Sequence, residues 1–116
     1  MKLCIYQADL NVIHRQCIRS LSASGYRVEL HDIPKGYTHA IKECDIPSHY
    51  SLIDLRVIRE KQAVAVSIFS CYLSATNGTF HYNRIGEQSF IEHFLGELGK
   101  DARNKFEMAA GGAEFA

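Results

Sequence analysis

The side chains best suited to metal binding or catalysis lie between positions 31 and 49 of this 116-residue chain. They combine imidazoles, a thiol and carboxylates: His31, Asp32, His39, Cys44, Asp45 and His49. Structural zinc sites use three or four such ligands and start from pairs about two to five residues apart. The spacing here matches none of those patterns. We therefore expect scattered polar loop residues, and predict neither a metal nor another cofactor.

A second candidate for chemistry is a charged stretch that reads as a strand. Asp54 and Glu60 share one strand parity with Arg56 between them, and Lys61 follows. Two carboxylates and a lysine could hold a magnesium ion and activate water, so a metal-dependent hydrolase or nuclease is an alternative function. A solvent-facing strand with alternating charges is the commoner meaning of this pattern. No catalytic residue is predicted, and the balance favours a protein that is not an enzyme.

A third candidate is a binding surface of basic and aromatic side chains. Tyrosine and arginine are enriched at protein interfaces, and basic residues interleaved with aromatics can also bind single-stranded nucleic acid. The candidate surface residues lie on the first helix, in the central loop and around one hairpin: His14, Arg15, Arg19, Tyr37, His39, His49, Tyr50, Arg56, Arg59 and Lys61.

The N-terminal elements that must position these residues form a strand, a helix and a strand. A short apolar run over 1–6 predicts a buried strand. Asp9 is a good N-cap for a helix with apolar residues at helical spacing from Leu10 to Leu21, and Gly25 ends it. Alternation over 26–31 predicts a second strand. This order is a βαβ unit, so the two strands should be parallel with a right-handed crossover.

Residues 33–50 are expected to form a long irregular connection. Pro34, Gly36 and Pro47 interrupt the segment, and only 38–44 could form a helical turn or two. Long loops in compact domains are often functional, which makes this segment a favoured site.

The C-terminal half predicts three strands and a helix. A strand over 53–57 has one polar face, and the strand over 63–73 is apolar on both parities, which predicts a central strand covered on both sides. Asn77-Gly78 predicts a hairpin, and a helix should span 87–98 before Gly99. Residues 100–116 lose periodicity and are expected to be disordered or derived from an expression vector.

The predicted fold class is therefore α+β. One domain over 1–99 holds a mixed sheet of about five strands in the order β-α-β-(long loop)-β-β-β-α. Two helices over such a sheet leave part of one face uncovered, which a homodimer could bury.

The element order also resembles the thioredoxin-like layout, with Pro47 shortly before the third strand. In that family the reactive thiol lies at the start of the first helix, where this chain has Asp9-Leu10-Asn11-Val12. The resemblance therefore implies a thioredoxin-like fold that lacks its redox cysteines.

Composition narrows the function classes. The chain is 47% hydrophobic and 22% charged, with 13 basic and 13 acidic residues, which excludes a disordered chain and disfavours nucleic acid as the main partner. Its four cysteines have no C-x-x-C spacing, and no signal-peptide core or membrane span is recognisable, so a cytoplasmic protein with free thiols is expected. The favoured function is a small non-enzymatic protein-interaction module that acts as a regulator, inhibitor or adaptor.

Overall fold

The centre of the molecule is a long hairpin of two strands, β4 (His49–Glu60) and β5 (Ala63–Ser74). In β4 the buried side chains recur at every second residue, Ile53, Leu55 and Val57, because successive side chains of a strand point to opposite faces. β5 pairs with β4 along its whole length, from Ala63 opposite Glu60 to Ser74 opposite His49. The computed structural model describes residues 1–99, 105–110 and 113–114.

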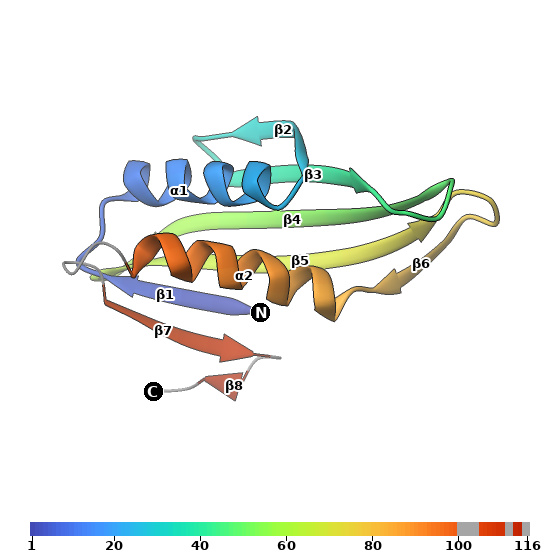
Figure 1. Ribbon diagram of the computed structural model, residues 1–116. Coiled ribbons are helices and arrows are strands. Elements are labelled where there is room, and N and C mark those ends of the chain that lie inside the picture. The colour runs from blue at the N-terminus through green and yellow to red at the C-terminus, as the bar shows by residue number, and fades with distance from the viewer. Residues whose placement is uncertain (100–104, 111–112, 115–116) are drawn as a thin grey trace.

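The other strands extend this hairpin into one sheet in the order β2-β3-β4-β5-β1-β7-β8, with β6 paired to β5 (Figure 1). All of the paired neighbours run antiparallel. The remaining elements are β1 (Lys2–Tyr6), α1 (Leu10–Ala23), β2 (Arg27–Asp32), β3 (Tyr37–Glu43), β6 (Thr79–Tyr82), α2 (Arg84–Leu98), β7 (Lys105–Ala110) and β8 (Ala113–Glu114). The predicted α+β class is confirmed.

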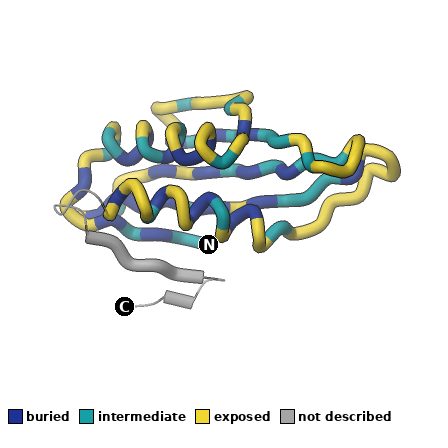
Figure 2. The backbone as a smooth tube through the Cα atoms, viewed as in Figure 1, coloured by how far each residue is buried: buried dark blue, intermediate teal, exposed yellow. Residues whose placement is uncertain are grey.

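Both helices pack on the same face of the sheet (Figure 1). The Asp9 carboxylate caps α1 by accepting hydrogen bonds from the backbone N–H groups of Asn11 and Val12. Asn83 caps α2 by accepting one from the Gly86 N–H at 3.0 Å. Phe90 and Phe94 of α2 are fully buried in the core between the helices and the sheet. Figure 2 shows burial concentrated where these two layers meet.

The prediction of an irregular connection over 33–50 is wrong for most of its length. Residues Tyr37–Glu43 form β3, and no helical turn occurs over 38–44. β3 begins after a tight turn in which Gly36 has a φ of +68°, and a Cβ atom there would lie 2.1 Å from the Val57 carbonyl oxygen. Gly36 is therefore needed to bring this turn against β4, where its carbonyl accepts a hydrogen bond from the Val57 N–H.

The first two strands run in the same direction, as predicted, but they are not neighbours. Three strands, β3, β4 and β5, lie between β2 and β1. The crossover through α1 therefore spans most of the sheet, and the adjacent βαβ strands that the thioredoxin-like layout implies are absent from the described residues. Pro47 lies in the turn between β3 and β4.

None of the four cysteines forms a disulfide, as expected from their spacing. The prediction for 100–116 falls largely on residues outside the described part. Within that range the backbone of β7 pairs with β1, and β8 pairs with β7. Among the described helices, none is long and apolar enough to cross a bilayer.

Candidate functional site: the open sheet face

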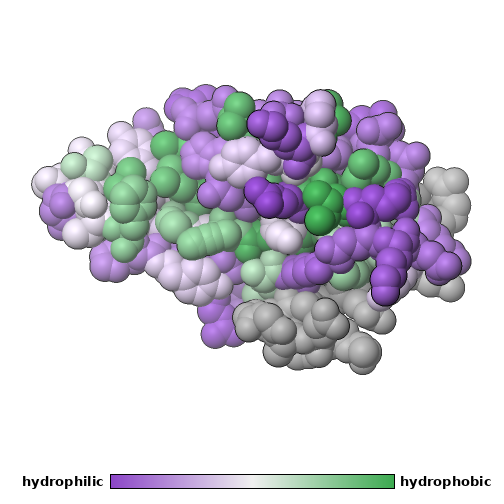
Figure 3. All heavy atoms as spheres, turned by 180° about the vertical axis from the view of Figure 1, so that it is seen from behind, coloured by the Kyte–Doolittle hydropathy of each residue, from purple (hydrophilic) through white to green (hydrophobic). Residues whose placement is uncertain are grey.

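The sheet face opposite the two helices carries no covering element among the described residues (Figures 1 and 3). We call it the open face. Strand alternation and pairing register give its members, which lie on the opposite parity from the buried core residues of each strand. They include Cys4, Tyr6, Leu30, Tyr37, His39, Tyr50, Leu52, Asp54, Arg56, Ile58, Phe69, Cys71, Leu73, Phe80 and Tyr82.

Exposed apolar side chains concentrate on the open face. Nine large hydrophobic residues are exposed among those described, and six of the nine belong to it: Tyr6, Leu30, Ile58, Phe69, Phe80 and Tyr82. The rings of Phe69 and Tyr82 stack with centroids 6.0 Å apart. Figure 3 shows hydrophobic side chains gathered along this side of the molecule between hydrophilic ones. Gathering of this kind marks an interaction surface, whereas singly scattered apolar residues do not.

A polar cluster lies beside this apolar region, centred on Asp54 of β4. One oxygen of the Asp54 carboxylate accepts a hydrogen bond from the Tyr37 hydroxyl at 2.8 Å and lies 2.6 Å from His39 Nδ1. The other ring nitrogen of His39 lies 3.9 Å from a Glu29 carboxylate oxygen. The hydrogen bond to Asp54 raises the pKa of Tyr37, with desolvation adding to the shift. The cluster therefore ties β2, β3 and β4 together across the open face.

This arrangement does not assemble a catalytic set. An Asp-His pair acts as a base when the far nitrogen of the imidazole meets a nucleophile. Here that nitrogen faces the Glu29 carboxylate instead. His39 therefore connects two carboxylates within the described part of the chain and activates no hydroxyl or thiol there.

The proposed pairing of Asp54 with Glu60 on one metal ion is contradicted. The two residues lie six positions apart on one strand, about 20 Å at the rise of an extended chain. The Glu60 carboxylate pairs with the Lys2 ammonium at 3.0 Å, and Lys61 lies in the β4–β5 turn with a φ of +54°. No group of three metal-ligating side chains occurs among the residues that the structure describes.

The predicted binding residues separate into three places. Four lie on the open face: Tyr37, His39, Tyr50 and Arg56. Three lie on α1: His14, Arg15 and Arg19. The remaining three lie near turns at opposite ends of β4: His49, Arg59 and Lys61.

Two of the residues near the turns, Arg59 and His49, contact backbone carbonyls. The Arg59 guanidinium donates to the Ala8 carbonyl at 2.8 Å, and the His49 ring lies 2.9 Å from the Pro47 carbonyl and packs beside Tyr72. The structure thus does not unite the ten residues in one surface.

The apolar members of the open face were missed as site residues. The double-sided apolar pattern of 63–73 predicted a strand covered on both sides, and β5 is indeed central, but the side that carries Phe69 is open. Phe80 and Tyr82, two residues apart after Asn77-Gly78, were a usable signal, because β6 places both on the same face.

No protein-family model matches the chain, and no curated protein matches it in sequence.

Proposed function

We propose that this chain is a small non-enzymatic interaction module that docks a protein partner on its open face and acts as a regulator, inhibitor or adaptor. The observation that supports this is the gathering of six of the nine exposed large apolar side chains on one uncovered sheet face. Burial of such side chains against a partner stabilises a complex by the hydrophobic effect, at roughly 25 cal/mol per Å² of apolar area before the costs of association.

The polar cluster supplies specificity in this proposal. Asp54 holds Tyr37 and His39 in fixed positions, so a partner meets side chains that lose little conformational freedom on binding. Arg56, the next open-face residue of β4 after Asp54, is exposed and available for a carboxylate of the partner.

Protein is favoured over nucleic acid by the charges of the same surface. Exposed aromatic rings such as Phe69 and Tyr82 could stack on bases, and Arg56 could meet a phosphate. However, the carboxylates of Asp54 and Glu29 lie among them, and carboxylates repel a phosphate backbone. A second copy of the chain remains one protein that could occupy this face.

The test compares three forms of the chain. Phe69→Asp places a charge in the centre of the open face, and Ile85→Asp places one on an exposed apolar residue of α2, away from that face, as the control. Circular dichroism checks that all three are folded. Each is used as bait in an extract of the native source, its mass is measured by sedimentation, and its affinity for a single-stranded oligonucleotide is measured at two salt concentrations.

The proposal expects a stoichiometric protein that is retained by the original chain and by the Ile85→Asp form and lost by the Phe69→Asp form. If the partner is a second copy, sedimentation gives two chains for the first two forms and one for the third. Capture that is indifferent to Phe69→Asp, or salt-sensitive oligonucleotide binding that requires Phe69, would contradict it.

A further inference from the structure

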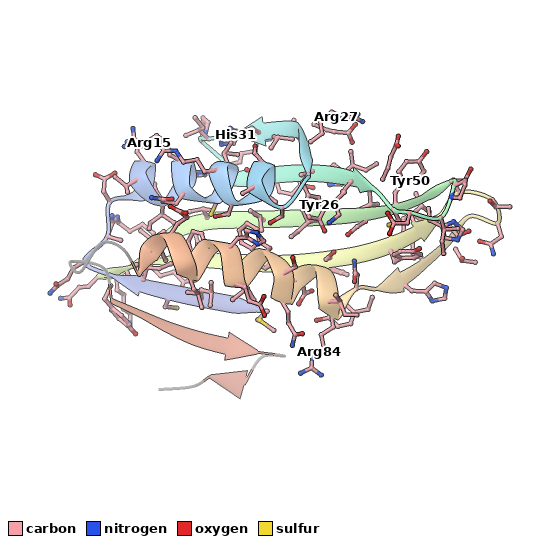
Figure 4. The ribbon with its side chains drawn as sticks, in the orientation of Figure 1. Arg15, Tyr26, Arg27, His31, Tyr50 and Arg84 are labelled. Carbon is pink, nitrogen blue, oxygen red and sulfur yellow. The ribbon has the colours of Figure 1, made fainter. Side chains whose placement is uncertain are left out.

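A groove of about 470 Å³ lies beside α1, on the helix layer and away from the open face. It is formed by one side of α1 and the end of the β2–β3 hairpin, and its main lining residues are His14, Arg15, Ile18, Arg19, His31 and Ile33. Figure 4 shows Arg15 and His31 on the same side of α1. A volume of several hundred Å³ is that of sites for small organic ligands.

The most informative lining residue is His14. Its side chain is buried, with 3% of its surface exposed, and neither ring nitrogen has a hydrogen-bond partner among the described residues. Buried polar atoms in native proteins are almost always paired, because an unpaired one costs about 1–3 kcal/mol. The His31 ring is its nearest aromatic neighbour, 5.6 Å away between centroids, and no hydrogen bond joins the two. The His14 imidazole thus lines the groove, while its N–H donor and its acceptor are buried and pair with no described residue.

The charges around the groove favour a negatively charged ligand. Arg15 and Arg19 bring two guanidinium groups, and neither forms an ion pair with a described carboxylate. The lining contains no aspartate or glutamate. A metal ion would meet only two imidazoles, fewer than the three or four protein ligands of a zinc site, together with two repelling cations. The two guanidinium groups and the shortage of metal ligands therefore both favour an anion over a metal ion.

The apolar lining residues favour a ligand that also carries an apolar group. Ile18 and Ile33 give the groove an apolar wall, and Ile33 is 52% exposed. Inorganic phosphate would leave this wall in contact with water, whereas an aromatic or aliphatic group would cover it. A carboxylate attached to such a group can accept hydrogen bonds from a guanidinium in the two-pronged geometry that arginine favours and a further one from an imidazole N–H.

We propose that this groove binds a small organic carboxylate with an apolar body, its carboxylate held by Arg15 and Arg19 beside the imidazoles of His14 and His31, and its body packed on Ile18 and Ile33. This site is separate from the open face, so it stands or falls independently of the proposed protein-binding function.

The experiment uses 1-naphthoate as the probe and NMR of the labelled full chain as the readout. Neutral 1-naphthalenemethanol, inorganic phosphate and Zn²⁺ are titrated separately. The variants are the double substitution Arg15→Gln with Arg19→Gln, which removes both charges, and Arg84→Gln as a control for loss of a distant arginine, since Arg84 lies on the other helix, away from Arg15 (Figure 4). All are surface substitutions that leave the core intact.

The expected result is a saturable shift of the His14 and His31 ring signals by 1-naphthoate. Binding should weaken about tenfold or more in the double variant, which corresponds to about 1.4 kcal/mol, and should be unchanged in Arg84→Gln. Equal binding of the neutral alcohol, stronger perturbation by Zn²⁺ or by phosphate alone, or naphthoate shifts confined to open-face residues would each overturn the proposal.

Discussion

The Tyr82 hydroxyl donates a hydrogen bond to the Glu87 carboxylate at 2.7 Å, which joins the last residue of β6 to the first turn of α2. The second carboxylate oxygen accepts a hydrogen bond from the Ser70 N–H at 3.1 Å, and the Met1 ammonium lies 4.0 Å from the oxygen that binds Tyr82. Ser70 is on β5 between the stretch paired to β1, which ends at Ser67, and the stretch paired to β6, which begins at Cys71. Glu87, only 1% exposed, thus supplies the acceptor that no strand offers there.

Replacing Glu87 should therefore destabilise the fold. Glu87→Ala leaves the buried Ser70 N–H without an acceptor and should lower the free energy of unfolding by about 2–4 kcal/mol. Glu87→Gln retains an amide oxygen for Ser70 and should cost about 1 kcal/mol. Urea denaturation followed by circular dichroism measures both. Equal midpoints for Glu87→Ala and the original chain would contradict this role.

Alanine substitutions at two glycines of α2 should change the stability of the fold in opposite directions. A Cβ at Gly86 would lie 2.8 Å from the Ser70 hydroxyl oxygen and 2.6 Å from the Asn83 amide nitrogen, so Gly86→Ala should disturb the helix cap and cost about 1–3 kcal/mol. Gly96 has no atom within 4 Å of that position, and Gly96→Ala should stabilise by about 0.5–1 kcal/mol through helix propensity. Thermal unfolding of the pair tests this, and a stabilising Gly86→Ala would refute the packing argument.

The free energy of unfolding should decrease as the pH is lowered, because of His14. Burial, with a contribution from the neighbouring His31, lowers the pKa of His14 below its ordinary value of 6.5. The unfolded chain then binds a proton at His14 that the folded chain does not, so stability present above pH 6.5 is lost as the pH falls toward the lowered pKa. Denaturation midpoints between pH 7.5 and about pH 5 should decline, and His14→Leu should flatten the decline. The same slope in both forms would assign the effect to other groups.

The pKa of Tyr37 should depend on the charge of Asp54. The hydrogen bond to the Asp54 carboxylate raises the pKa of Tyr37 above its ordinary value of 10.0. Asp54→Asn removes the charge, so the Tyr37 titration should move back toward pH 10, which NMR of labelled tyrosine measures directly. Glu92→Gln on α2 is the charge-matched control and should leave Tyr37 unchanged. A Tyr37 midpoint that Asp54→Asn does not lower would show that the hydrogen bond is absent in solution.

Local sequence signals predicted the elements whose stabilising contacts are also local. Asp9 caps α1, Gly25 follows that helix with a φ of +86°, and Gly78 adopts a φ of +69° in the turn before β6. β3 was missed because its core-facing residues are the small Thr38 and Ala40, which give a weak alternating pattern after Pro34 and Gly36.

The candidate site could not be predicted from local sequence patterns, because it depends on how distant strands pair. Tyr37, His39 and Asp54 meet only because β3 pairs with β4 in one particular register, Tyr37 opposite Arg56 and His39 opposite Asp54. A shift of β3 by one residue would turn Tyr37 and His39 to the helix face, away from Asp54. Which face of β5 remains open likewise depends on where α1 and α2 dock.

The pairing of β1 with β5 has a consequence for how the chain folds. Lys2 pairs with Ser67, whereas the β4–β5 hairpin closes through a turn of only two residues, Lys61 and Gln62. Contacts between distant residues form slowly because a long loop must close first. During synthesis, at about 5–20 residues per second, β1 waits several seconds for β5. We infer that the β4–β5 hairpin forms before β1 joins it.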